Sequence, residues 1–246
     1  MLSFFCIIER GDYMRTLILG DSITEGKLGF DYIHLLENYD IHSKGIGGET
    51  LFGLTEWMFD EILKGDYDQI VIAIGHNDII LPILKTMGKM FVKPYLSLIE
   101  RGSVPTKDPV EFERLYRKVI KSIKEVSKSK VAVTTLSTLN ENKNSLSARR
   151  RHEYNSAIRG MSDICDVIDL GRGFDKELEQ LETKDYFLMT SGVTFILDKL
   201  LTKKDFGSNK LSKKRGLHFT MDGIHLNEAG ALIYKQEISE FLKKSG

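Results

Sequence analysis

The stretch Thr16-Leu17-Ile18-Leu19-Gly20-Asp21-Ser22 is a short apolar run that leads directly into a glycine, an acid and a hydroxyl residue. Residues 16–19 have the length and composition of a buried strand. We expect the hydroxyl of Ser22 to lie at the carboxyl end of this strand, just before a helix begins. In open α/β sheets, ligands bind at this edge.

Apolar runs of strand length recur along the chain and alternate with helical patterns. The further runs are residues 70–74, 131–136 and 167–170, with a weaker one near Ile41. Apolar spacings of three and four predict helices at residues 30–36 and 51–62. This alternation, with right-handed crossovers, predicts an α/β fold: a three-layer sandwich built on a parallel sheet.

Two longer helices have clear start signals. Asp108, Pro109 and Glu111 supply an N-cap, a first-turn proline and a capping-box acid for a helix over residues 109–127. Its expected buried face consists of Phe112, Leu115, Tyr116, Val119, Ile120, Ile123 and Val126. A final helix should begin after Asn227 as its cap. Its expected buried residues are Ala231, Tyr234, Ile238 and Phe241.

Length and composition favour one domain. The 246 residues are 41% hydrophobic, enough to fill a substantial core. We expect a single domain over residues 1–246, with additions at 79–107 and 171–218 and a dispensable extension at 1–13, because Met14 could itself be a start. In the additions, Phe91, Tyr95, Tyr186 and Phe187 could line a hydrophobic slot or simply pack the insertions onto the core.

Charge and cysteine usage limit the functional classes. The 35 basic and 35 acidic residues balance, so nucleic-acid binding is not expected. Cys6 and Cys165 cannot form a disulfide framework, which favours a reducing, cytoplasmic location. No segment has the length of a membrane span or the pattern of a signal peptide. Residues 199–215 hold seven basic residues and one acid, typical of a solvated, mobile loop, or else of an anionic-ligand contact.

Two segments could supply a nucleophile and its base. Ser22 needs a base to become nucleophilic, and taken alone it is better interpreted as a helix cap. Asp222-Gly223-Ile224-His225 places a carboxylate and an imidazole three residues apart. Asp222 would orient the ring of His225, which would take the proton of Ser22. The alternative is a turn aspartate beside a surface histidine.

Two further segments could supply hydrogen-bond donors to an oxyanion. Gly47-Gly48-Glu49-Thr50 follows the second strand and could offer the backbone N–H of Gly48. Gly75-His76-Asn77-Asp78 follows the third strand and could offer the side chain of Asn77, beside the N–H of Ser22. Each could also be only a turn.

Together these segments resemble the four sequence blocks of the SGNH hydrolases, also called GDSL esterases and lipases, over residues 15–245. The resemblance implies a flavodoxin-like sheet of order 2-1-3-4-5 and no metal or other cofactor. It implies the triad Ser22, Asp222 and His225 and an oxyanion hole of Ser22, Gly48 and Asn77. The substrate would be a small or short-chain carboxylic ester, such as an O-acetyl group or a lipid ester, cleaved through an acyl-enzyme on Ser22.

Asp21 precedes the predicted nucleophile and His76 precedes the predicted oxyanion amide, so both are candidate substrate-binding residues. His76 stands where many family members carry threonine. We interpret it as a substitution that this position tolerates and not as a change in the pocket wall. Asn155 and Asp169 also match the family, and we expect structural roles for them.

Two other classes of function remain open. A metal-dependent phosphoesterase would share fragments such as Gly-Asp and Gly-His-Asn-Asp, but its opening Asp-x-His pair is missing. A non-catalytic carbohydrate-binding module could use the same fold. The sequence does not predict an oligomeric state.

Overall fold

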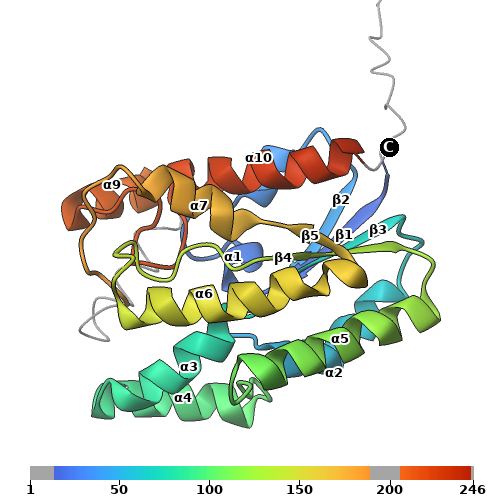
Figure 1. The fold of residues 1–246 in the computed structure, drawn as a ribbon, viewed down its shortest axis with the longest axis horizontal. Coiled ribbons are helices and arrows are strands. Elements are labelled where there is room, and N and C mark those ends of the chain that lie inside the picture. The colour runs from blue at the N-terminus through green and yellow to red at the C-terminus, as the bar shows by residue number, and fades with distance from the viewer. Residues whose placement is uncertain (1–13, 189–205, 245–246) are drawn as a thin grey trace, which may run out of the picture.

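A five-stranded parallel sheet forms the centre of the computed structural model, which describes residues 14–188 and 206–244 (Figure 1). Its strand order is β2-β1-β3-β4-β5, and every neighbouring pair is parallel. The strands are β1 Thr16–Gly20, β2 Ile41–Gly45, β3 Gln69–Ala73, β4 Lys130–Thr134 and β5 Asp166–Ile168. The predicted fold class and strand order are therefore confirmed.

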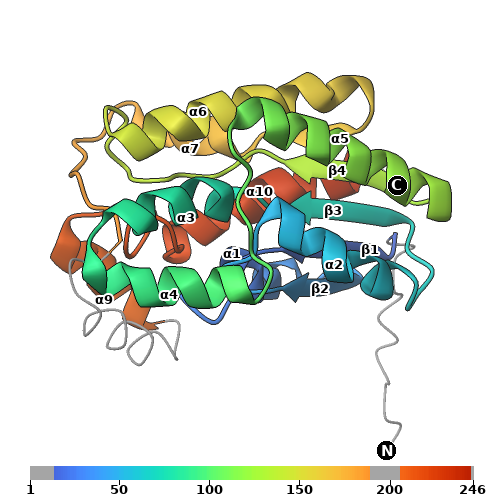
Figure 2. The ribbon, with the colours of Figure 1, turned by 90° about the horizontal axis from the view of Figure 1, so that it is seen from below.

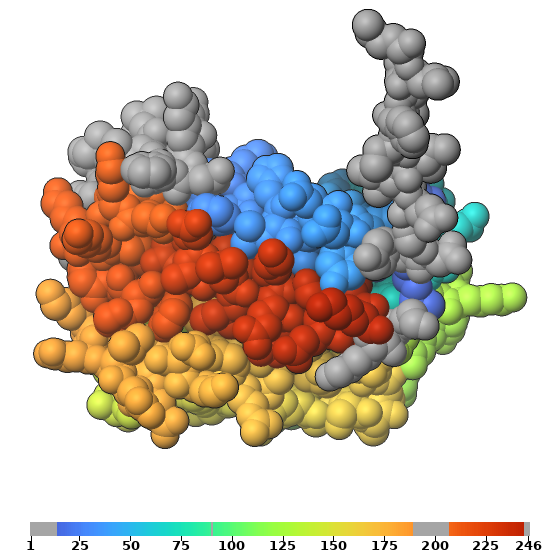
Figure 3. Space-filling model, turned by 90° about the horizontal axis from the view of Figure 1, so that it is seen from above, coloured from blue at the N-terminus to red at the C-terminus, as the bar shows by residue number. Residues whose placement is uncertain are grey.

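Helices cover both faces of the sheet. The α-helices described are α1 Ser22–Glu25, α2 Leu51–Ile62, α3 His76–Thr86, α4 Lys89–Glu100, α5 Pro109–Val126, α6 Leu146–Arg159, α7 Leu170–Leu178, α9 Phe206–Arg215 and α10 Glu228–Lys244. Two short 3₁₀ helices are η1 Ile33–Leu36 and η2 Gly160–Asp163. On one face α2 packs on α5 and α5 on α6, and on the other α10 packs on α7 and η1 (Figure 2). Figure 3 shows α10, in red, running across this second face.

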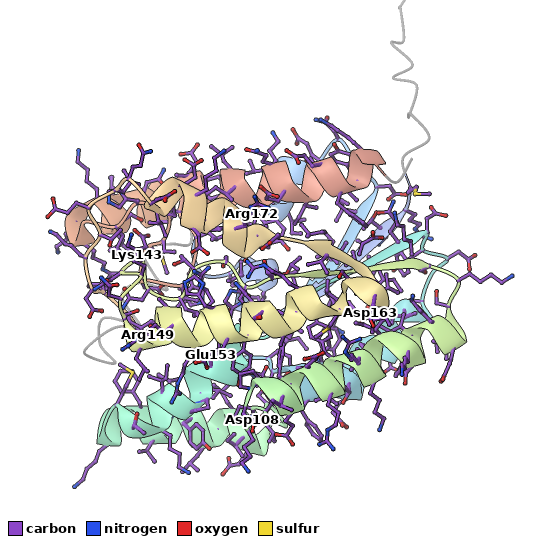
Figure 4. The ribbon with its side chains drawn as sticks, viewed as in Figure 1. Asp108, Lys143, Arg149, Glu153, Asp163 and Arg172 are labelled. Atoms are coloured by element: carbon purple, nitrogen blue, oxygen red, sulfur yellow. The ribbon has the colours of Figure 1, made fainter. Side chains whose placement is uncertain are left out.

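The core lies where buried strands meet the apolar helix stripes. Every residue of β1 and β3 is buried, as expected for strands covered on both faces. Asp108, at the start of α5 in Figure 4, caps that helix by accepting from the backbone N–H groups of Val110 and Glu111. Phe112 and Tyr116 of α5 are fully buried. Val126 was predicted to be buried but is 51% exposed, because it forms the end of the helix.

Several element boundaries differ from the predictions. The helix expected at residues 30–36 is only the 3₁₀ turn η1, and the fifth strand ends at Ile168, so Leu170 begins α7 instead. The last helix begins at Glu228, and Asn227 accepts from the N–H of Gly230 as its predicted cap. Phe241 is only partly buried, unlike the other three residues of the expected face.

The two expected additions contain regular structure. Segment 79–107 continues α3 and adds α4, while segment 171–218 includes most of α7 and all of α9. The side chain of Phe174 in α7 is fully buried against Tyr234 and Phe219. Residues 206–215 form a helix, so the mobile loop predicted there is wrong for this part of the basic run. Residues 199–205, Cys6 and the extension 1–13 lie outside the described residues.

Across residues 14–188 and 206–244, no helix combines the length and the apolar character needed to cross a bilayer.

Candidate active site

Ser22 lies at the turn between β1 and α1. A side chain on Gly20 would place its Cβ 2.2 Å from Oγ1 of Thr24 and 2.8 Å from the carbonyl oxygen of Ala73, so this tight turn requires glycine. The cap of α1 is Asp21, whose Oδ1 accepts from the N–H of Ile23 at 3.0 Å. Ser22 is therefore not the helix cap, and its hydroxyl is available for other contacts.

That hydroxyl meets a histidine from the other end of the chain. The Oγ of Ser22 lies 3.0 Å from Nε2 of His225, and Nδ1 of His225 lies 2.7 Å from Oδ2 of Asp222. Because a carboxylate can only accept, Nδ1 carries the proton, and in the neutral ring Nε2 is left to accept from Ser22. The structure thus brings together the three residues predicted to form the triad.

The environment of Asp222 keeps it ionised. Its side chain is almost fully buried, and burial alone would raise its pKa. The ring of His225 and the backbone N–H groups of Ile224 and His225 outweigh burial and hold the pKa of Asp222 below its usual value. A charged acceptor therefore faces the imidazole and stabilises it when it takes up a proton.

A buried glutamate holds the segment that carries this pair. Glu141 is 1% exposed and accepts four hydrogen bonds from residues 218–220 at 2.7–2.9 Å. The N–H of Asn140 donates to the carbonyl oxygen of Gly223. Gly223 has a φ of 91°, and a Cβ at this position would lie 2.3 Å from the carbonyl oxygen of Tyr186, so the turn requires glycine. Our sequence analysis missed Glu141, since its Asn-Glu-Asn context carries no recognisable signal.

The loop that carries the predicted donor Gly48 lies beside Ser22, and Asn77 is hydrogen-bonded to the same loop. A Cβ built on Gly47 would be 4.0 Å from Cβ of Ser22, so the loop after β2 adjoins the serine. Gly48 has a φ of 80°, which favours glycine. Asn77, the second residue of α3, donates through Nδ2 to the carbonyl oxygen of Glu49 at 2.9 Å. Its amide has a second N–H that remains for a ligand.

Two buried carboxylates anchor these donors. Glu49 accepts from the indole N–H of Trp57 at 2.9 Å and from its neighbour, the N–H of Thr50. Asp78 accepts from the N–H of Leu51 and from both donors of Thr106. Burial raises the pKa of Asp78 to about 6, against these three hydrogen bonds, which lower it. Both carboxylates lie within the sequence motifs that predicted the donors, but those motifs did not predict their supporting role.

Asp21 and His76, predicted to bind substrate, are instead engaged within the protein. They are 1% and 4% exposed, and Nδ1 of His76 lies 3.1 Å from Oδ2 of Asp21. Nε2 of His76 lies 3.1 Å from Oγ of Ser137. Both side chains are therefore buried and hydrogen-bonded within the protein, and they do not form a wall that faces a substrate.

Asn155 and Asp169 have the structural roles expected. The amide of Asn155 forms two hydrogen bonds with the backbone of Leu136, at 2.7 and 2.9 Å. Asp169 caps α7 through the N–H of Arg172 and pairs with Arg159.

Charged side chains border the loop that follows β2. Nη2 of Arg101, just after α4, donates to the carbonyl oxygen of Gly47 at 2.5 Å. A Cβ built on Gly47 would lie 3.0 Å from Oε2 of Glu25, which pairs with Lys27. Leu98 of α4 packs against Gly48. Arg101, Glu25 and Lys27 thus form a polar rim around this loop.

The aromatic residues predicted to line a slot have mixed surroundings. Phe91 and Tyr95 of α4 are half-buried, and the ring of Tyr95 faces Lys85. Tyr186 lies under the guanidinium of Arg215, while Phe187 packs against the core.

A separate cavity of about 530 Å³ lies between α6, α7 and residues 138–143. Its lining includes Lys143 and Arg172, both labelled in Figure 4, and excludes the triad. Within the described ranges, no group of three or more His, Cys, Asp or Glu side chains is arranged to hold a metal ion.

Fold and site together define an α/β sandwich with a serine–histidine–aspartate arrangement at the carboxyl edge of its sheet. No protein-family model matches the sequence, and no curated protein sequence matches it. Solved structures do match in fold. The acetyl xylan esterase AlAXEase is 22% identical with a TM-score of 0.62, covering 92% of this chain and 98% of its own.

Two further structures give the same result. LAE5, an alpha/beta hydrolase from the metagenome of Lake Arreo in Spain, is 17% identical with a TM-score of 0.60, over 95% of this chain and 96% of its own. Axe2, an acetylxylan esterase from Geobacillus stearothermophilus, is 18% identical with a TM-score of 0.58, over 95% and 94%. At these identities the likeness shows a shared fold over nearly the whole chain.

Proposed function

We propose that this protein is a serine hydrolase of the SGNH type that cleaves carboxylic esters. The observation that carries the proposal is the continuous contact from Ser22 through His225 to Asp222, with distances of 3.0 and 2.7 Å. A hydroxyl, an imidazole and a buried carboxylate in this order are the parts of a nucleophile–base unit.

The geometry supports a two-step reaction. His225 accepts the proton of Ser22 as the serine oxygen attacks the ester carbonyl, and it then gives that proton to the departing alcohol oxygen. Water attacks the resulting acyl-enzyme by the same route and releases the acid and the free serine. The N–H groups of Ser22 and Gly48 and the second amide N–H of Asn77 would stabilise the oxyanion.

The substrate we favour is a small acyl group, such as acetyl, on a polar alcohol. The polar rim formed by Arg101, Glu25 and Lys27 supports a hydrophilic alcohol over a long lipid chain. Two of the structures that share this fold are described as acetyl xylan esterases. Two variants of Axe2 described as catalytic mutants replace a serine and an aspartate, the residue types that meet His225 here.

Hydrolysis of p-nitrophenyl acetate tests the proposal. The wild-type chain and a Ser156→Ala control, which alters an exposed serine of α6, should release p-nitrophenol, and Ser22→Ala should not. Activity should persist in EDTA. Loss of activity in EDTA together with hydrolysis of p-nitrophenyl phosphate would instead indicate a metal-dependent phosphoesterase. No turnover of esters with acyl chains of two to eight carbons would leave the non-catalytic binding module.

A further inference from the structure

A second histidine–aspartate pair lies directly behind the proposed site. Asp21 precedes the nucleophile Ser22, and His76 precedes the oxyanion donor Asn77. Their side chains meet at 3.1 Å, and both are at least nine-tenths buried. The hydrogen bond therefore joins the end of β1 to the start of α3, the two elements that carry the reacting hydroxyl and the oxyanion amide.

The contacts of this pair place a proton on Nδ1 of His76. Oδ1 of Asp21 already accepts from the N–H of Ile23, and Oδ2 faces Nδ1 of His76. A carboxylate can only accept, so Nδ1 of His76 must carry a proton. In the neutral ring, Nε2 then accepts from the hydroxyl of Ser137, which also hydrogen-bonds to Tyr234. Each ring nitrogen of His76 thus has a partner.

The same contacts separate this histidine from the proton transfer itself. The hydroxyl of Ser22 contacts Nε2 of His225, whereas the partners of His76 are Asp21 and Ser137. With 4% of its surface exposed, His76 offers no face to a substrate. Its effect on the reaction must pass through the residues that it holds.

We propose that His76 is a positioning residue that sets the distance between the Ser22 hydroxyl and the Asn77 amide by clamping Asp21. This role rests on the hydrolase function proposed above. Asp21 caps α1, so a shift of its carboxylate moves the first turn of α1 and Ser22 with it. A misplacement of about 1 Å between reacting groups can cost about 10²-fold in rate.

The role differs in its kinetics from a purely structural one. Loss of the clamp should weaken stabilisation of the transition state and leave ground-state binding of a small ester nearly unchanged. His76→Leu removes the donor to Asp21 and leaves a buried carboxylate oxygen without its partner. His76→Asn retains the clamp, because the amide nitrogen of Asn can take the place of Nδ1.

The experiment measures kcat and KM for p-nitrophenyl acetate and inhibition by phenylboronic acid, which adds to a serine hydroxyl as a tetrahedral analogue. The variants are His76→Leu, His76→Asn and the control His34→Leu, whose histidine side chain is 78% exposed. For His76→Leu we expect kcat to fall about 10- to 100-fold, KM to change less than about twofold, and boronate inhibition to weaken in parallel with kcat. His76→Asn should retain most of the activity, and His34→Leu all of it.

Several results would overturn the role. These are an unchanged kcat in His76→Leu, an effect on KM alone, or equal losses in His76→Leu and His76→Asn. Thermal melting reports whether each variant folds. If His76→Leu does not, His76→Asn is compared with His76→Gln, whose amide nitrogen lies beyond the Nδ1 position, and equal activities would again overturn the clamp. A wild-type chain with no esterase activity would refute the hydrolase function itself, whereas active wild type with unaffected His76 variants would refute only the clamp.

Discussion

Removal of the Asn77 amide is the most informative single change in the proposed oxyanion hole. Asn77 is 6% exposed, and one of its amide N–H groups is committed to the carbonyl oxygen of Glu49. The other N–H is one of three donors proposed for the oxyanion. Because the site is buried, we expect that water cannot fully replace the lost donor in Asn77→Ala.

The expected loss can be separated into catalysis and stability. One missing oxyanion donor lowers kcat by about 10²- to 10³-fold, or about 3–4 kcal/mol of transition-state stabilisation. The missing hydrogen bond to Glu49 lowers the free energy of unfolding by only about 1 kcal/mol. The variant should therefore fold normally and bind p-nitrophenyl acetate with a KM close to that of the wild type.

The assay compares kcat and KM of Asn77→Ala, the wild type and Asn144→Ala, a control at an exposed asparagine. Urea denaturation of each chain measures the change in stability. If Ser22→Ala is inactive while Asn77→Ala keeps a kcat within about threefold of the wild type, Asn77 does not stabilise the oxyanion and the reasoning is refuted.

Three further predictions concern the carboxylates and pH. Asp222→Asn should lower kcat by about 10⁴-fold by allowing the wrong tautomer of His225, and an active variant would remove Asp222 from the triad. Hydrolysis should rise with pH over about pH 6 to 7, where imidazoles lose their proton, because His225 must be neutral to act as a base; a rate independent of pH from about 5 to 8 would contradict this. Asp78→Ala should destabilise the chain by about 2–4 kcal/mol, because three donors lose their acceptor. Burial raises the pKa of Asp78 to about 6 in the folded chain, so the folded state prefers the protonated carboxyl. This carboxyl therefore stabilises the fold most at pH values below the pKa that it has in the unfolded chain. The difference in unfolding free energy between the wild type and Asp78→Ala should therefore become smaller as the pH rises from about 4 to about 6. A difference that grows over this range would show that the folded state prefers the ionised carboxyl.

Local patterns predicted the strands and the Asp222–His225 pair because both depend on short stretches of sequence. The apolar run at residues 16–19 and the proximity of Asp222 and His225 in the chain are readable without knowledge of the fold. The turn of Gly20 into α1 follows from the same stretch, although the cap is Asp21 and not Ser22.

The supporting contacts could not be predicted because they join residues far apart in the chain. Glu141 and its partners at 218–220 are separated by about eighty positions, and the contact of His76 with Asp21 spans 55. A buried charged residue has no distinctive sequence signal until its partners are known. For the same reason His76 was interpreted as a substrate contact or a tolerated substitution, whereas its burial between Asp21 and Ser137 indicates a link.

The most direct test of the central claim is to identify the residue that reacts with diethyl p-nitrophenyl phosphate. A serine activated as described should displace p-nitrophenolate and retain one diethylphosphoryl group, detected by intact mass and located by peptide mapping. The account predicts a single modification at Ser22, forming at the same rate as ester hydrolysis is lost. Modification at another residue, or full loss of activity with Ser22 unmodified, would contradict it.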